Sequence, residues 1–183
     1  MSKTHSHISP ELKDWIERQP MFFLASAPLQ PDGHINVSPR GLDSLRVIGE
    51  LQVIILDLTG SGNETAAHLA QNGRLTVMFC AFDAEPRILR LYGRGKVITP
   101  HAAQWQDYRQ HFPVQQPGVR QIFDLSVTRI QISCGFGVPR MDLVGQRDLL
   151  NNWAVKKGPD GVRDYQHTKN SLSIDGLIPP KLR

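Results

Sequence analysis

Residues 56–65 read Leu-Asp-Leu-Thr-Gly-Ser-Gly-Asn-Glu-Thr, and this stretch decides how the rest of the chain is interpreted. A strand-like apolar run ends here in a glycine-containing turn, and a segment of helical composition follows to Gln71. A strand, a turn and a helix start in this order present free backbone N–H groups and the positive end of a helix dipole, which favour a phosphate. An ordinary helix start capped by Asn63 explains the same residues equally well.

Two named phosphate-binding motifs come close to this stretch without matching it. Gly60-x-Gly62 follows a strand and precedes a helix, as in the Rossmann motif, but Thr65 occupies the third glycine position. The helix is also too short to cross a sheet, and no further strand–helix units follow. The P-loop motif is excluded because no lysine follows the glycines.

Outward from this stretch, the chain consists mostly of strand patterns joined by turns. Strands are expected at 21–27, 34–38, 45–48, 51–57, 74–82, 87–98 and 127–134. Helices are expected to start at Ser9 and to cover 64–71, 99–111, 117–123 and 146–157. Because most of these strands follow one another as in hairpins, with only short helices between them, the pattern favours a closed or nearly closed antiparallel barrel over a doubly wound sheet.

The length of 183 residues fits a single domain, residues 1–183, with a flexible start at 1–8 and a C-terminal extension at 158–183. No apolar run approaches the roughly 20 residues of a membrane span, and the polar start lacks a signal peptide's apolar core. We therefore expect a soluble, cytoplasmic protein with no membrane partner.

Composition argues against metal and nucleic-acid sites. The two cysteines form no CxxC pair, and none of the seven histidines has a metal-binding partner at i,i+4. The net charge is +4, but the basic residues are scattered, which does not indicate a nucleic-acid surface. This excess suits a small anionic ligand, and a mildly basic solvated surface accounts for it equally well.

A second candidate binding segment is Val37-Ser38-Pro39-Arg40-Gly41. Arg40 at a strand end offers a planar, permanently charged donor for a phosphate, and Pro39 and Gly41 shape the backbone beside it. A surface arginine in a loop is the simpler interpretation of this segment alone.

Taken in order, these segments resemble the pyridoxamine 5'-phosphate oxidase-like family of FMN-binding split barrels. The resemblance covers residues 9–135 and includes Ser38-Pro39-Arg40-Gly41, the Gly-Ser-Gly-Asn-Glu-Thr turn, Asn72-Gly73-Arg74 and Arg90-Leu-Tyr-Gly-Arg94. It implies a mainly β fold, a six-stranded antiparallel split β-barrel with short helices at its ends, and a homodimer with two FMN sites. The expected FMN-binding residues are Ser38, Pro39, Arg40, Gly41, Asp57, Thr59, Gly62, Asn63 and Thr65.

The chain departs from the true oxidases of this family at two places. Their C-terminal Trp and Arg-x-His segment, which hold flavin and substrate phosphate, are missing here. Their basic pair in the phosphate loop is replaced by Glu64-Thr65, and we expect the Glu64 side chain to point away from a phosphate or to cap the helix. The family's activity on pyridoxamine phosphate is therefore not carried over.

The function expected from the resemblance is an FMN-dependent oxidoreductase acting on a small-molecule substrate or electron donor, with no catalytic side chain required. A flavin carrier or sensor without turnover is one alternative. A split barrel that binds another flavin or haem is the other. The apolar content of the tail, residues 169–178, predicts that it packs on the barrel near the flavin, and a loosely attached arm explains it equally well.

Overall fold

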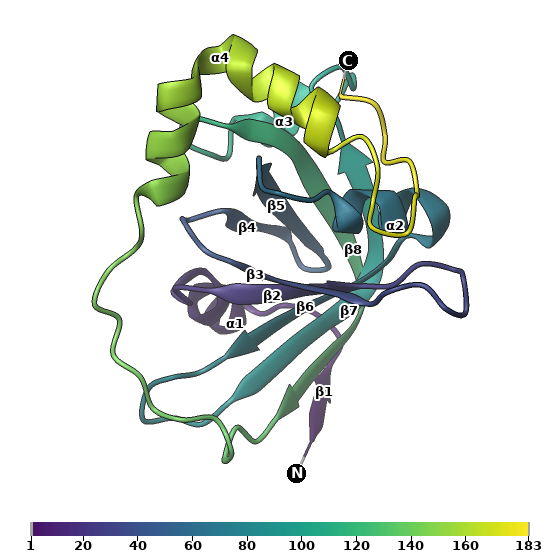
Figure 1. Cartoon of the computed structure of the whole chain (residues 1–183). Helices are drawn as coiled ribbons and strands as arrows, with labels where there is room; N and C mark the ends of the chain where they lie inside the picture. Colours follow the sequence, from purple (N-terminus) through teal and green to yellow (C-terminus); the bar gives the residue numbers. More distant parts are fainter. Residues whose placement is uncertain (1, 183) are drawn as a thin grey trace.

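The computed structural model describes residues 2–182, and its strands form one antiparallel sheet that curves round on itself (Figure 1). The strands are β1 (Lys3–His5), β2 (Phe22–Ser26), β3 (Asn36–Arg40), β4 (Leu45–Gly49), β5 (Gln52–Leu58), β6 (Arg74–Cys80), β7 (Ile88–Ile98) and β8 (Val119–Ser133). The helices are α1 (Pro10–Glu17), α2 (Glu64–Asn72), α3 (Trp105–Arg109) and α4 (Leu149–Lys169).

The strand order in the sheet is β3-β2-β6-β7-β8-β5-β4, with β1 pairing on β8. All neighbouring strands run antiparallel, so the predicted mainly β architecture with short helices is confirmed. Its hydrophobic core gathers on the inner face and includes Leu24, Val77, Leu91 and Phe123, which are fully buried.

The sheet has eight strands rather than the six that the resemblance implies. The length of β8 explains one of the two additional strands, β1. On one side of β8, β5 pairs only as far as Ser126, and the exposed end of β8 beyond it pairs with β1 at residues 130–132. The predicted flexible start at residues 1–8 therefore contains an ordered strand at Lys3–His5.

Two short helices begin and end as the sequence predicts. Ser9 caps α1, because its hydroxyl oxygen accepts a hydrogen bond from the Leu12 N–H at 3.3 Å, and Pro10 occupies the first helical position. Gly73 ends α2 in the left-handed conformation at φ 67°, which a residue without a side chain adopts at little cost.

Three predicted helices differ from the observed elements. Residues 117–123 are not helical: β8 begins at Val119, and its apolar residues pack against the neighbouring strands. Of the helix predicted at 99–111, only Trp105–Arg109 is α-helical, as α3. The helix predicted at 146–157 begins at Leu149 and continues past a kink at Gly158 to Lys169, so the first part of the C-terminal extension is helical rather than irregular.

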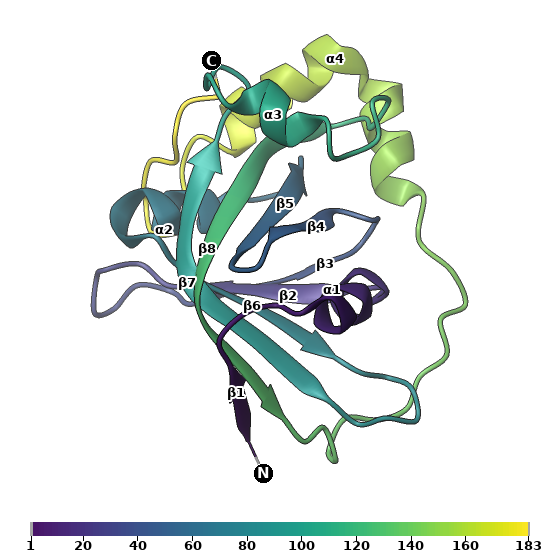
Figure 2. The ribbon, with the colours of Figure 1, turned by 180° about the vertical axis from the view of Figure 1, so that it is seen from behind.

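The C-terminal part of the chain covers one end of the sheet. After β8, an extended segment runs along the outside of the molecule and leads into α4, which crosses above β5 and β8 beside α3 (Figures 1 and 2). The tail then descends over α2. This arrangement brings the end of α4 close to the turn between β5 and α2.

Candidate functional site

The turn between β5 and α2, residues 59–63, is the centre of the candidate site. None of the backbone N–H groups from Gly60 to Ala66 has a hydrogen-bond acceptor among the described residues, and the first bond of α2 runs from the Ala67 N–H to the Asn63 carbonyl. Asn63 does not cap the helix with its side chain. A row of free N–H groups at a helix start is a ready-made site for an anion.

Two carbonyl groups of this turn are held by side chains from other parts of the chain. The Gly60 carbonyl accepts a hydrogen bond from the Asn170 side chain at 3.0 Å, and the Gly62 carbonyl accepts one from Arg120 Nη1 at 2.8 Å. Both partners are buried. The turn is thus fixed by side chains from β8 and from the residue that follows α4.

Beneath the turn lies a charged cluster built around Asp57, which is the penultimate residue of β5 and is fully buried. Its Oδ1 is 2.7 Å from Arg40 Nη1, and its Oδ2 accepts hydrogen bonds from Arg120 Nε and Gln121 Nε2, both at 2.8 Å. Burial alone would raise the pKa of Asp57, but the charges of Arg120 and Arg40 and the hydrogen bonds from Arg120 and Gln121 outweigh it and lower that pKa. The cluster of two guanidinium groups and one carboxylate keeps a net positive charge.

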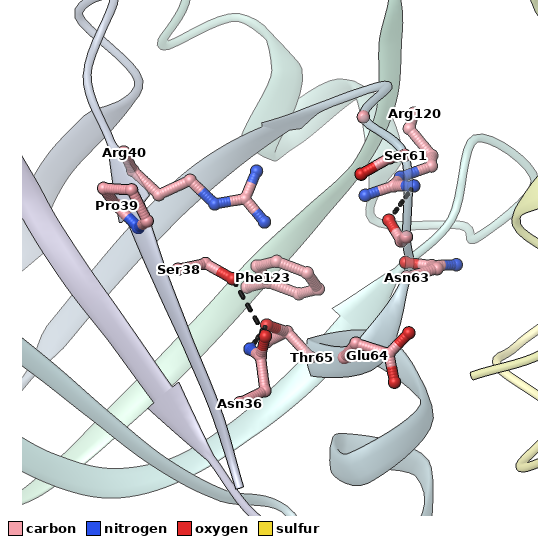
Figure 3. Close-up of a pocket in the computed structure, with 12 residues that line it drawn as sticks. Asn36, Ser38, Pro39, Arg40, Ser61, Asn63, Glu64, Thr65, Arg120 and Phe123 are labelled. Carbon is pink, nitrogen blue, oxygen red and sulfur yellow. Dashed lines mark hydrogen bonds between the residues drawn. The ribbon is translucent and has the colours of Figure 1, made fainter. Parts of the chain in front are cut away.

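The turn and the strand β3 enclose a pocket with a volume of about 330 Å³ (Figure 3). Twelve residues line it: Asn36, Ser38, Pro39, Arg40, Gly60, Ser61, Gly62, Asn63, Glu64, Thr65, Arg120 and Phe123. A chain of hydrogen bonds joins its two walls, because Ser38 donates to Asn36 and Asn36 donates to Thr65, each at 3.0 Å. Serine, threonine, asparagine and arginine side chains suit a phosphate or a polyol chain.

Two buried polar groups at this pocket lack a protein partner. Asn63 is 2% exposed, and its Nδ2 donates no hydrogen bond within the protein, while its Oδ1 accepts one from Gln121 at 2.7 Å. The Nε of Arg40 is likewise buried without an acceptor. Unsatisfied buried donors are costly, and a bound anion would satisfy them.

A second, more apolar cavity of about 540 Å³ adjoins this pocket and shares Pro39 and Arg40 with it. Most of its lining is apolar: Pro20, Met21, Leu42, Phe82, Met141, Leu143, Leu149 and Leu150. Gly41, Asp142, Gln146 and Arg147 add polar groups. Together, the two cavities provide a polar, positively charged end and an apolar end on either side of the β3 terminus.

The structure brings together most of the residues that the sequence singles out. Six of them line the first pocket: Ser38, Pro39, Arg40, Gly62, Asn63 and Thr65. Asp57 lies beneath the pocket and contacts its two arginines. Gly41 lines the apolar cavity instead. Thr59 lies outside both cavities, because its hydroxyl donates to the Gly118 carbonyl and accepts from Gln166 at the end of α4.

Several pocket residues are absent from the sequence prediction, and Arg120 is the most important of them. The interpretation of residues 117–123 as a helix concealed it, because its position beside Asp57 depends on the pairing of β5 with β8. Glu64 behaves as expected: its carboxylate turns to the tail and accepts a hydrogen bond from the Ile174 N–H at 3.1 Å. The tail lies against this site, but hydrogen bonds attach it rather than the predicted apolar packing, because Leu172, Ile174 and Ile178 are 53%, 71% and 72% exposed.

Other candidate residues contribute little to a ligand site. His68 is buried on α2 with its Nδ1 2.9 Å from the Ser26 hydroxyl, and burial lowers its pKa. Among residues 2–182, no three histidine, cysteine, aspartate or glutamate side chains gather in a metal-binding arrangement. Within the same residues, no helix combines the length and apolar character needed to cross a membrane.

Comparison with known proteins gives consistent matches. The sequence profile of the family described as pyridoxamine 5'-phosphate oxidase matches residues 8–134. The pyridoxamine 5'-phosphate oxidase family protein ustO of Aspergillus flavus is 41% identical over 191 residues, which cover 94% of this chain and 76% of the relative.

Solved structures match the fold at lower sequence identity. HupZ of Group A Streptococcus aligns with a TM-score of 0.51 and 22% identity over 67% of this chain and 91% of HupZ. A Clostridium acetobutylicum protein related to general stress protein 26 of B. subtilis (pyridoxinephosphate oxidase family) aligns with a TM-score of 0.50 and 12% identity over 68% of this chain and 86% of that protein. These two proteins share the fold with the chain.

Proposed function

The chain belongs to the pyridoxamine 5'-phosphate oxidase family, and from this premise we propose that it binds FMN and works as a flavin-dependent oxidoreductase. The observation that carries the proposal is the row of free N–H groups from Gly60 to Ala66. These groups border a pocket that also contains Arg40 and Arg120.

The phosphate end of FMN matches the first pocket. The free N–H groups, the α2 dipole and the two arginines all favour a dianionic phosphate monoester. The buried Nδ2 of Asn63 and Nε of Arg40 are further donors that a phosphate would satisfy. Thr65 and Ser38 add hydroxyl groups of the size and polarity that suit the ribityl chain.

The ring end of FMN matches the adjoining cavity, whose lining is mostly apolar. Flat, largely apolar ligands bind in such cavities, and a few polar groups fix their orientation. A site for one terminal phosphate at a helix start, without a Rossmann pyrophosphate turn, favours FMN over FAD.

When bound, flavin would supply hydride or electron transfer, and the protein residues would bind it, orient it and exclude water. Asp57 contributes by holding Arg40 and Arg120 in place rather than by touching the ligand. The site needs no acid or nucleophile from the protein for this chemistry. The physiological reactant would be a small-molecule substrate or electron donor.

The C-terminal part of the chain differs from that of the true oxidases, and this difference argues against pyridoxamine phosphate as the substrate. The chain lacks their Trp and Arg-x-His segment, and here the tail lies against the phosphate-loop residue Glu64. We therefore expect no efficient oxidation of pyridoxamine phosphate. Turnover of that substrate near about 1 per second or faster would contradict this part of the proposal.

The test is to identify the ligand that the purified protein retains and to titrate the ligand-free protein with FMN, FAD, riboflavin and haem. FMN should bind most tightly, and absorption spectra separate flavin from haem. Much tighter binding of FAD or haem would overturn the proposal. Anaerobic reduction of the bound flavin by NADH or NADPH would support an enzyme, whereas a flavin that no donor reduces would support a carrier or sensor.

A further inference from the structure

Asn170, the residue that follows α4, connects the C-terminal segment to the candidate phosphate site. It is 2% exposed, and its carboxamide lies between two groups of that site. Its Oδ1 accepts a hydrogen bond from Arg120 Nη1 at 2.8 Å, and its Nδ2 donates to the Gly60 carbonyl at 3.0 Å. A guanidinium group only donates and a carbonyl only accepts, so these two partners fix which end of the carboxamide faces which group.

This contact controls the direction of the peptide groups in the turn. In a trans peptide unit, the carbonyl and the following N–H point to opposite sides. Because the Gly60 carbonyl points to Asn170, the Ser61 N–H points away from Asn170. The Gly62 carbonyl points to Arg120 Nη1, so the Asn63 N–H also turns away from that side.

The side opposite Asn170 is the one that faces β3 across the pocket. In Figure 3, Ser38, Pro39 and Arg40 lie on one side of the pocket, and the turn with Ser61 and Asn63 lies on the other, between the pocket and the tail. Neither the Ser61 nor the Asn63 N–H has an acceptor among the described residues. Asn170 thus holds the turn in the conformation that presents these groups to an anion.

The end of α4 docks on this turn at a second point, which makes Asn170 part of a rigid support. Gln166, one helical turn earlier, donates to the Thr59 hydroxyl at 2.7 Å, and Thr59 is itself bonded to Gly118. The Asn170 backbone N–H donates to the Gln166 carbonyl. Helix α4 therefore fixes the position from which Asn170 reaches the turn.

We propose that Asn170 is a positioning residue that gives the pocket its preference for phosphorylated over unphosphorylated flavin. It does so by holding the Gly60 carbonyl and the Arg120 guanidinium at the same time. This inference rests on the proposed FMN binding, but its effect on the turn is measurable without any ligand.

The experiment compares the full-length protein with the variants Asn170→Ala and Asn170→Asp. The first removes both contacts. The second keeps an acceptor for Arg120 but places a negative oxygen against the Gly60 carbonyl. For each variant, we expect the FMN affinity to fall about tenfold or more, the scale of a lost hydrogen bond to a charged group. Riboflavin affinity should change less than about twofold, because riboflavin has no phosphate to bind the turn.

Hydrogen exchange on the ligand-free protein gives the second readout. The hydrogen-bonded amides at the two ends of the turn, those of Thr59 and Ala67, should exchange faster in both variants, while those of the central strands β6 and β7 keep their wild-type rates. Ser171→Ala is the matched control, because the neighbouring Ser171 is exposed and makes no side-chain hydrogen bond among the described residues. It should change neither measurement.

Equal losses of FMN and riboflavin affinity, or unchanged exchange at Thr59 and Ala67, would overturn the inference. A wild-type protein that does not bind FMN would instead refute the proposed function, and the exchange measurement would still test the role of Asn170 in the turn. The two failures are therefore distinguishable.

Discussion

Asp57 shows how one buried residue organises the candidate site. A carboxylate without access to water is costly unless positive charges and hydrogen-bond donors surround it. Asp57 meets this condition through Arg40, Arg120 and Gln121. In return, it holds both arginines where their remaining donors border the pocket. The carboxylate therefore acts on the ligand through the two guanidinium groups.

The lowered pKa of Asp57 predicts a loss of stability in acid. The unfolded pKa is about 3.9, so the stabilisation is fully present above that value and is lost as the pH falls through the lower, folded pKa. Asp57→Asn should cost about 3 to 5 kcal/mol at neutral pH, because it leaves two arginines without their anion, and should flatten this acid dependence. Urea unfolding between pH 6 and pH 3 measures both effects.

The matched control for Asp57 is Asp43→Asn, which breaks an exposed ion pair with Arg46. Surface pairs of this kind contribute about 1 kcal/mol or less. If Asp57→Asn destabilises the protein no more than Asp43→Asn does, the central role given to Asp57 is wrong.

Arg40 carries the second prediction at this scale. Arg40→Ala should weaken FMN binding by about 1.5 to 3 kcal/mol, the range for a hydrogen bond to a charged partner, without unfolding the barrel, since Asp57 keeps Arg120. Flavin titration with thermal unfolding as a check provides the measurement. Arg129→Ala removes the same charge from an exposed position on β8 and should leave the affinity unchanged. Unaltered FMN affinity in Arg40→Ala would assign Arg40 a purely structural role.

Residues of the site differ in how well the sequence predicts them. Gly62, Asn63 and Thr65 are neighbours along the chain, so a strand–turn–helix pattern is enough to group them. Arg120 reaches the same place only through the pairing of β5 with β8, in which Asp57 lies opposite Gln121. Local sequence contains no signal for such a contact. The role of Asn170 cannot be predicted either, because its contact with Gly60 also joins residues far apart in the sequence.

At the scale of elements, the sequence predicts the strands and the capped helix ends well. It predicts the helices at 99–111, 117–123 and 146–157 poorly. Alternating or continuous apolar runs mark most strands, and Ser9 and Gly73 mark two helix ends. The sequence predicts a helix where β8 starts, because Pro117 and Gly118 precede a mixed polar and apolar run that suits either element. At Gly158-Pro159, the pattern predicts a helix end, but the chain resumes its helical course after a kink.

The tail after α4 is the element whose contribution to binding is most easily tested. It contacts the turn through Asn170, the α2 start through Ile174 and the β2–β3 loop through Asp175. Deleting residues 169–183 should lower FMN affinity or change the reactivity of the reduced flavin with acceptors, while the oligomeric state persists. Titration, stopped-flow oxidation and light scattering measure these three properties. If the first two match the intact protein, the tail is only a surface arm.

Attachment of the tail should also depend on pH. Asp175 lies 2.6 Å from His34 Nδ1, and its hydrogen bond and charge raise the pKa of His34. The attachment is therefore complete below about pH 6.5 and weakens as the pH rises through the higher, folded pKa of His34. Limited proteolysis of the tail should accelerate between pH 6 and pH 8.5. His34→Gln, digested at the same pH values, should lack this change; equal pH profiles in both proteins would contradict the prediction.

At the scale of the whole molecule, β3 and β4 lie at the two ends of the main strand order in the described part of the chain. Strand β3 pairs with β2 on one side only, and Pro39 on it has no N–H to offer a further strand. Side chains of this region are nevertheless apolar and exposed: Ile35 is 74% and Val37 is 60% exposed. We infer that association here uses side-chain packing rather than the addition of a strand.

This surface predicts a twofold homodimer, because the same patch can cover itself on a second copy. Light scattering should give twice the chain mass of 20.6 kDa. Val37→Glu should shift the protein toward monomer, since it places a charge in the packed patch, and should weaken flavin binding if the partner covers the ligand. Val114→Glu, at an exposed site on the loop after α3, is the control and should leave the dimer intact. A wild-type monomer, or a dimer that Val37→Glu does not weaken, would show that the β3 patch is not the interface.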